Sequence, residues 1–121
     1  MVSEDPLYPL ISFRCLSLPG VSFAGKVAPL KECADLCEKY EMTLVEDASH
    51  SPGGWSERET SGDCKWTQAA CLSFHPVKHI CAGEGGAVLT NLTEVADRCK
   101  ALRSHGIVRP FDDKHPTPWK Y

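Results

Sequence analysis

The stretch MTLVEDASH at residues 42–50 decides the fold. Its first six residues form a short apolar run with β-branched side chains that ends in two acids. This pattern is typical of a buried parallel strand whose carboxyl end faces a ligand site. Residues 29–40, PLKECADLCEKY, begin with proline and carry apolar side chains every three or four positions, which predicts an amphipathic helix. A helix leading into a buried strand indicates α/β architecture.

Two more strands and a second helix are predicted downstream. Residues 69–74 (AACLSF) and 86–90 (GAVLT) are short apolar runs, separated by a loop that contains histidine and glycine. Asn91 is expected to cap a final helix that stops at Gly106. The expected apolar stripe of that helix consists of Leu92, Val95, Ala96, Cys99 and Leu102. The order of elements argues against an all-helical or all-β fold.

The chain divides into three regions. Residues 1–22 contain apolar pieces without a clear period and are broken by prolines, which predicts an irregular lead-in. Residues 23–106 hold all the strands and helices expected from periodicity. Residues 107–121 are polar and again broken by prolines, and we expect them to form a tail.

Composition narrows the classes of function. The chain has 121 residues, 13 basic and 16 acidic side chains, and an apolar share of 42%, which fits a single globular domain. Its net charge of -3, with both signs scattered, argues against nucleic acid as a partner. No apolar run is long enough to cross a membrane, and the first residues are acidic rather than basic. We therefore expect a soluble, cytoplasmic protein.

Seven cysteines occur without a CxxC motif. Several replace apolar residues in the expected helices and strands, so we interpret them as reduced core thiols and expect no metal. An alternative is a small zinc or thiol module, because zinc requires four nitrogen or sulfur ligands and five candidates lie close in sequence. These candidates are Cys64, Cys71, His75, His79 and Cys81.

Polar side chains follow two of the expected strands. Asp47 and His50 come after the first strand, and Ser73 and Lys78 come after the second. If the strands are adjacent, their carboxyl ends bring these groups to one edge of the sheet, where α/β proteins bind ligands. Each group also has a simpler interpretation. Lys78 could be an ordinary solvated lysine, and Asp47 could form a solvated acidic edge with Glu46. His50 could be an ordinary loop histidine and Ser73 an ordinary serine at the end of a strand.

Three segments together carry a family resemblance. VEDASHSPGG (45–54), CLSFHPVKHICAGEGGAVLTN (71–91) and LRSHGI (102–107) resemble, in order and spacing, the DegT/DnrJ family of pyridoxal-phosphate-dependent nucleotide-sugar aminotransferases. The resemblance covers about residues 23–106, and FAG at its start fits the segment before the family's helix. It implies part of the large domain of a PLP-dependent transferase fold of the aspartate aminotransferase type, with an incomplete sheet and flanking helices.

The resemblance also implies residue roles. Lys78 corresponds to the lysine that binds pyridoxal 5′-phosphate covalently and later moves a proton, a role that suits a buried, desolvated amine. Asp47 would pair with the pyridine nitrogen, His50 with the phenolic oxygen, and Ser73 with the phosphate. The glycines at positions 83–86 would shape the turn. No aromatic residue is assigned to stack on the cofactor ring.

The implied reaction moves an amino group from an amino-acid donor, usually glutamate, to a keto nucleotide sugar for surface-polysaccharide biosynthesis. A lysine at position 78 disfavours the related dehydratases, which carry histidine there. DASH (47–50) and PWKY (118–121) resemble the branch that acts on UDP-linked 4-keto amino sugars in pseudaminic acid assembly. Family members are several times longer, so we expect a truncated portion of a homodimeric enzyme; the alternative is an inactive or interacting remnant.

Overall fold

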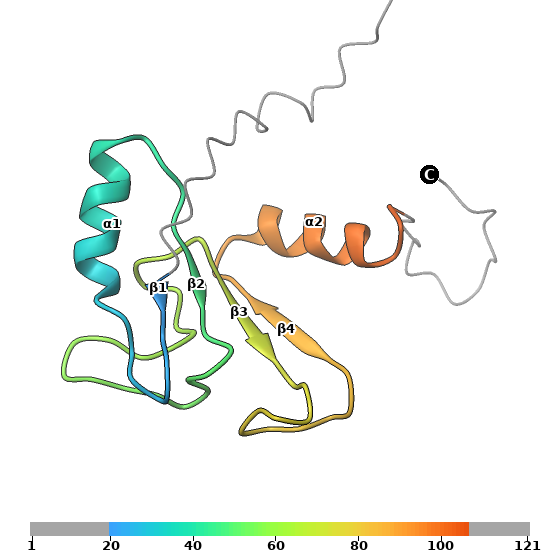
Figure 1. The fold of residues 1–121 in the computed structure, drawn as a ribbon. Coiled ribbons are helices and arrows are strands. Elements are labelled where there is room, and N and C mark those ends of the chain that lie inside the picture. Colours follow the sequence, from blue (N-terminus) through green and yellow to red (C-terminus); the bar gives the residue numbers. More distant parts are fainter. Residues whose placement is uncertain (1–19, 107–121) are drawn as a thin grey trace, which may run out of the picture.

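The computed structural model describes residues 20–106 as a sheet with a helix on each side (Figure 1). The predicted α/β class and the order of the helices and the three longer strands are confirmed. The elements are β1 (Gly20–Val21), α1 (Leu30–Lys39), β2 (Val45–Asp47), β3 (Ala69–Ser73), β4 (Gly86–Leu89) and α2 (Thr93–Arg103).

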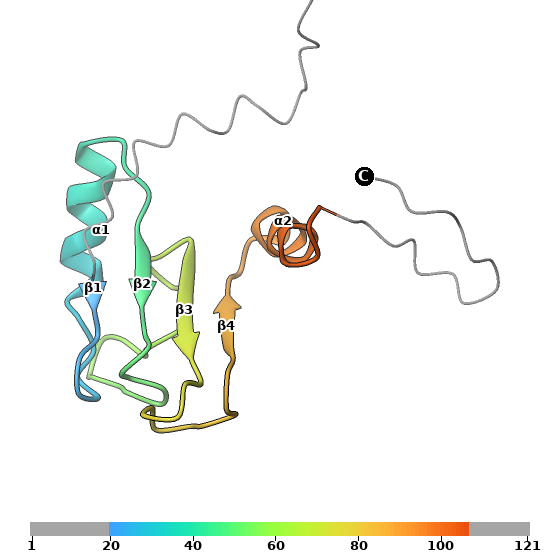
Figure 2. The same cartoon turned by 45° about the vertical axis from the view of Figure 1, so that its right-hand side comes forward.

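The strands lie in the order β1-β2-β3-β4. β1, β2 and β3 are parallel, whereas β4 returns antiparallel to β3. Figure 2 shows the consequence: the carboxyl ends of the three parallel strands, and the loop that joins β3 to β4, all lie at one edge of the sheet. The predicted meeting of the β2 and β3 ends is therefore confirmed.

The two faces of the sheet differ in burial. The register aligns Glu46, Ala70 and Leu89 on one face, which we call the back face. Glu46 and Ala70 there are fully buried, and Ala48, Cys64 and Ala70 form the apolar cluster of the core. The neighbouring row, Val21, Asp47, Cys71 and Val88, points to the opposite front face. In β2 itself Glu46 is buried, whereas Val45 and Asp47 on the front face are only partly buried, so β2 is not fully covered on both faces as expected.

The expected region boundaries are tested only in part. Gly20 and Val21 lie within the predicted irregular lead-in but pair with Glu46 and Asp47 as strand β1, so that prediction is wrong for these two residues. The isolated segment has no strand periodicity because only two of its residues join the sheet. The rest of the lead-in, 1–19, and the tail, 107–121, lie outside the described residues.

Helix α1 begins after Pro29 as predicted and buries Leu30 and Cys37. Tyr40, expected on the same stripe, is 59% exposed because it follows the last helical residue. The chain leaves the helix through Glu41 at φ 53°, and the Met42 N–H donates to the Cys37 carbonyl at 2.8 Å. This is the hydrogen bond of a Schellman ending.

The start of α1 is capped from a distant loop. Pro29 makes no side-chain cap. Instead, the Lys31 N–H donates to Glu59 Oε1 at 2.7 Å. A carboxylate at this position satisfies a free backbone donor and lies at the positive end of the helix dipole.

Replacing Glu59 with alanine should therefore lower the free energy of unfolding by about 0.5–2 kcal/mol, the usual effect of removing a helix cap. Urea unfolding followed by circular dichroism measures this change. Glu57→Ala is the matched control, because Glu57 is exposed on the same loop and forms none of the hydrogen bonds described. Equal midpoints for the two variants would contradict the capping role.

Helix α2 differs from its prediction at its start, whereas its end before Gly106 is as predicted. Leu92, not Asn91, occupies the N-cap position, and no side chain caps the helix. The Asn91 amide instead donates to the carbonyls of Asp63 and Cys64, at 3.1 and 3.4 Å. The last helical residue is Arg103, and Gly106 lies beyond it, donating to Ala101 O at 2.8 Å.

The apolar stripe of α2 is largely uncovered. No residue of this helix is buried, and Leu102 is 67% exposed. Both views place α2 past the end of β4, on the far side of the strands from α1 (Figures 1 and 2). Among residues 20–106, no helix is long and apolar enough to cross a membrane.

Six of the seven cysteines lie in the described part of the chain, and all six are free thiols. Burial raises the pKa of the Cys33, Cys64 and Cys71 thiols above the ordinary value, so these groups stay protonated at neutral pH. Cys64 packs in the back-face cluster and donates to Leu89 O at 3.2 Å. The interpretation as core thiols holds for the buried Cys37 and Cys64, whereas Cys33, Cys71 and Cys99 are only partly buried and Cys81 is exposed, so for Cys81 it is wrong.

Candidate functional site

The loops after β2 and β3 bring Lys78 and His50 into direct contact. Lys78 Nζ lies 2.7 Å from His50 Nε2, across a sequence separation of 28 residues. A charged lysine can only donate, so when it is an ammonium it requires an unprotonated Nε2 and places the imidazole proton on Nδ1. Lys78 is half-buried in this chain rather than fully buried as expected, because its loop lies at the sheet edge with solvent on one side.

Asp47 ends β2 on the front face, directly beside Cys71. Its carboxylate accepts a hydrogen bond from the Ser49 N–H at 3.0 Å. Hydrogen bonds from the Ser49 hydroxyl and backbone hold the pKa of Asp47 below its ordinary value, and the charges of Lys78 and His50 act in the same direction. The site therefore holds an ionised carboxylate near an amine and an imidazole.

Phe23 is a site residue that sequence reasoning did not assign. Its ring stacks on His50, with the ring centroids 5.1 Å apart and the planes at 28°. The Gly25 N–H also donates to the His50 carbonyl at 2.9 Å. The 23–25 turn therefore contacts both the ring and the backbone of His50. Gly54 packs closely against the 23–25 turn, and any larger residue would disturb this packing, because a Cβ at position 54 would lie 2.7 Å from the Gly25 carbonyl oxygen. The one feature of the sequence that could have pointed to Phe23 is the FAG segment at residues 23–25, which contributes to the family resemblance.

Ser73 ends β3 at the same edge. Its hydroxyl accepts a hydrogen bond from the His75 N–H at 3.4 Å, and no contact with Lys78 or His50 is observed. The loop closes through Gly86, which pairs with Ser73; a Cβ at Gly86 would lie 2.7 Å from the Leu72 carbonyl oxygen. The glycine therefore allows β4 to approach β3 closely, which agrees with the predicted shaping role.

Glu46 is buried on the back face, with 0% of its surface exposed. Its carboxylate accepts hydrogen bonds from Ser22 Oγ and Ser61 Oγ at 2.8 and 2.9 Å. The Gly62 N–H donates to the second oxygen at 2.9 Å. The alternative in which Glu46 and Asp47 form a solvated acidic edge is thus wrong for Glu46, because alternation along the strand turns the two side chains to opposite faces.

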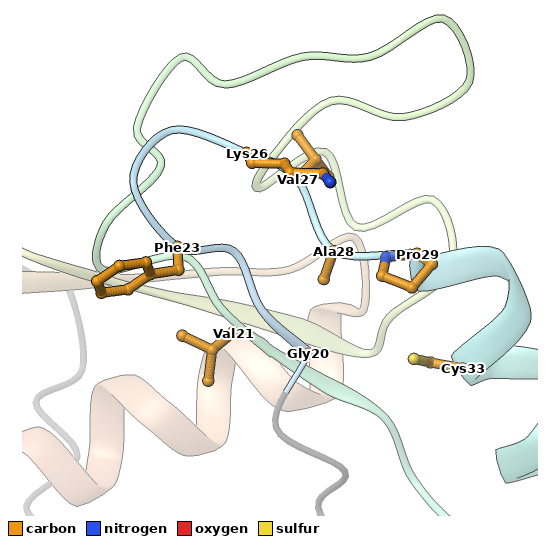
Figure 3. Close-up of a pocket in the computed structure, with 8 residues that line it drawn as sticks. All are labelled: Gly20, Val21, Phe23, Lys26, Val27, Ala28, Pro29 and Cys33. Carbon is orange, nitrogen blue, oxygen red and sulfur yellow. The ribbon is translucent and has the colours of Figure 1, made fainter.

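Two of the cavities formed by residues 20–106 lie near the sheet, and neither of these two is lined by Lys78 or His50. The cavity in Figure 3 has a volume of about 420 Å³ and lies between the β1 edge and the start of α1. Phe23 and Cys33 lie at opposite ends of it (Figure 3). The second, of about 630 Å³, lies between α2 and the β3–β4 pair, with Cys71 on its wall.

The side chains considered for a zinc module do not come together. Within residues 20–106, no group of three or more histidine, cysteine, aspartate or glutamate side chains could hold a metal ion. Cys64 lies in the back-face core, whereas His75, His79 and Cys81 are exposed in the loop after β3. The described geometry gives the zinc alternative no support.

Comparison with known proteins gives consistent matches. The sequence pattern of the DegT/DnrJ/EryC1/StrS aminotransferase family matches residues 16–117. The UDP-4-amino-4,6-dideoxy-N-acetyl-beta-L-altrosamine transaminase of Campylobacter jejuni serotype O:2 is 44% identical over 89 residues, covering 74% of this chain and 23% of that protein. The Helicobacter pylori transaminase of the same name is 33% identical over 108 residues, covering 89% and 28%. The chain spans about a quarter of the length of these relatives.

Solved structures contain the same arrangement of elements. Helicobacter pylori PseC, an aminotransferase involved in the biosynthesis of pseudoaminic acid, aligns with a TM-score of 0.68 at 34% identity, over 78% of this chain and 25% of that one. DesI, solved in the presence of its TDP-sugar product, aligns with a TM-score of 0.70 at 28% identity, over 84% and 26%. The predicted fold, a portion of a PLP-dependent aminotransferase, is confirmed.

Proposed function

Because the chain belongs to the DegT/DnrJ/EryC1/StrS aminotransferase family, we propose that it is the lysine-bearing portion of an enzyme that transfers an amino group to a keto nucleotide sugar. The observation that carries this proposal is the 2.7 Å contact between the Lys78 amine and the His50 imidazole, at the edge where Asp47 also ends its strand. Because the chain matches only about a quarter of the transaminases' length, we propose that it acts as part of a longer protein, which forms a homodimer.

The side chains at this edge fit pyridoxal 5′-phosphate. The cofactor has an aldehyde, a phenolic oxygen, a pyridine nitrogen and a phosphate, and the site offers an amine, an imidazole, a carboxylate and a hydroxyl. When bound, the cofactor supplies an electron-withdrawing ring that eases removal of a proton from the substrate carbon. The low pKa of Asp47 suits a carboxylate that must remain charged beside a protonated pyridine nitrogen.

Each residue then has a defined role. Lys78 binds the cofactor covalently and holds or moves the proton at its Nζ atom. His50 orients that amine through Nε2 and contacts the phenolic oxygen. Asp47 binds the pyridine nitrogen, and Ser73 donates its hydroxyl to the phosphate. Phe23 fixes the plane of the His50 ring by stacking on it.

We further propose that the acceptor is a UDP-linked 4-keto amino sugar and that the donor is glutamate. The support for the acceptor is the name shared by the Campylobacter jejuni and Helicobacter pylori transaminases that match this chain. Glutamate is proposed on the family resemblance alone. Cytoplasmic location and a part in surface-polysaccharide biosynthesis follow from this substrate class. Activity requires the parts of the enzyme that lie outside the matched quarter.

Covalent labelling tests the cofactor role on the 121-residue chain. The chain is incubated with pyridoxal 5′-phosphate, reduced with borohydride and mapped by peptide mass spectrometry. We expect the label to concentrate on the peptide that contains Lys78. Pyridoxine 5′-phosphate, which lacks the aldehyde, should compete for the site without leaving a label. Labelling spread over the lysines according to their exposure would contradict the proposal and favour the remnant interpretation.

A further inference from the structure

The buried carboxylate of Glu46 accepts three hydrogen bonds from two separate segments of the chain. Ser22 follows β1, and Ser61 and Gly62 belong to the long loop between β2 and β3. No ion pair in the described part of the chain includes Glu46. A fully buried carboxylate without a cation is retained only where its hydrogen bonds satisfy it, so these contacts are strong constraints on the backbone.

All hydrogens in this cluster are directed toward the carboxylate. The Ala28 N–H donates to Ser22 Oγ at 3.0 Å, which leaves the Ser22 hydroxyl free to donate to Glu46. Ser51 Oγ lies 2.6 Å from Ser61 Oγ, and Ser61 in turn donates to Glu46. Such an array needs a group that only accepts, which is the property of an ionised carboxylate.

Three residues of this hydrogen-bonded cluster are each adjacent in the chain to a site residue. Ser22 precedes Phe23, Glu46 precedes Asp47, and Ser51 follows His50. Phe23 and His50 stack on each other, and His50 contacts Lys78. The back-face cluster therefore fixes the backbone at the three points that supply the front-side groups.

We propose that Glu46 is a positioning residue: through Ser22, Ser61 and Ser51 it fixes the Phe23–His50 stack and thereby the position of the Lys78 amine. Glu46 itself touches none of these groups. The importance of the Lys78 position rests on the proposed cofactor role, whereas the effect of Glu46 on the stack does not.

Glutamine at position 46 is the sharpest probe because it has the shape of glutamate but one terminal donor. If its NH₂ replaces Oε2, it faces the Gly62 N–H, donor against donor. If the NH₂ replaces Oε1, the Ser22 and Ser61 hydroxyls lose their acceptor. Either orientation loosens at least one anchored segment without opening a cavity.

The experiment compares the 121-residue chain with Glu46→Gln and with the control Glu57→Gln, the same chemical change at an exposed position. Circular dichroism checks the fold, and NMR measures the Phe23–His50 ring contacts and the pH titration of the His50 imidazole. Borohydride trapping with pyridoxal 5′-phosphate measures labelling of Lys78. We expect Glu46→Gln to keep its secondary structure, lose the ring contacts, shift the His50 titration and label Lys78 about 10- to 100-fold more slowly. Glu57→Gln should behave like the unsubstituted chain.

Intact Phe23–His50 contacts and an unchanged His50 titration in folded Glu46→Gln would overturn the inference. If the unsubstituted chain is not labelled at Lys78, the cofactor role fails, and the two NMR measurements alone decide the role of Glu46. If Glu46→Gln does not fold, Ser61→Ala takes its place, because it removes one donor and the link to Ser51 while leaving the carboxylate. The same two NMR criteria then apply to Ser61→Ala.

Discussion

Replacing Lys78 with alanine is expected to abolish covalent attachment of pyridoxal 5′-phosphate to the chain. Lys78 holds its amine 2.7 Å from an imidazole, beside a strand that ends in an ionised carboxylate. Other described lysines lack this environment: Lys31 and Lys100 form exposed ion pairs with Asp35 and Asp97. Intact mass after borohydride reduction measures the label. Lys65→Ala, which removes an exposed lysine from a loop, should leave labelling unchanged.

The substitution Lys78→Arg tests whether labelling depends on a nucleophilic amine or only on a positive charge at this position. The guanidinium of arginine keeps the positive charge near His50 and Asp47, but it cannot condense with an aldehyde because it is not deprotonated in proteins. Lys78→Arg should therefore remain folded and unlabelled. Labelling of either variant at the level of the unsubstituted chain would show that the cofactor binds another lysine and would remove the basis of the proposed function.

Strands β2, β3 and β4 and helix α1 were predictable because their signals are local. Apolar runs of five or six residues, bounded by glycine, proline or polar residues, predict strands whatever surrounds them, and Pro29 followed by an apolar stripe predicts a helix. The resemblance added Asp47, His50, Ser73 and Lys78 as site residues. The structure brings His50 to Lys78 and places Asp47 and Ser73 at the same edge.

Residues whose roles depend on distant partners could not be predicted. Glu46 and Asp47 are adjacent acids, and nothing local shows that donors 15 to 24 residues away surround one of them on the buried face. Asn91 has the local features of a helix cap, but the carbonyls of Asp63 and Cys64 compete for its amide. Phe23 lies in a short turn, and only the tertiary fold brings its ring to His50.

The uncovered stripe of α2 shows a further limit of periodicity. Periodicity predicts which residues of a helix face an apolar partner, but it does not show whether that partner lies within the chain. Leu102 is on the predicted stripe yet mostly exposed, whereas Leu44, just before β2, is 1% exposed. Replacing each of these two leucines with alanine should therefore lower the free energy of unfolding by very different amounts.

Replacing Leu44 with alanine should lower the free energy of unfolding by about 2–5 kcal/mol, because it removes a fully buried side chain and leaves a cavity. The backbone at this position would survive the change: the Leu44 N–H donates to Gln68 Oε1 and its carbonyl accepts from the Gln68 N–H, both at 3.0 Å. The loss would therefore report packing alone. Leu102→Ala should change the same quantity by no more than about 0.5 kcal/mol, since its side chain is already solvated and alanine favours a helix. Urea midpoints from circular dichroism compare the two variants, and similar midpoints would mean that the back-face core does not carry the stability of this sheet.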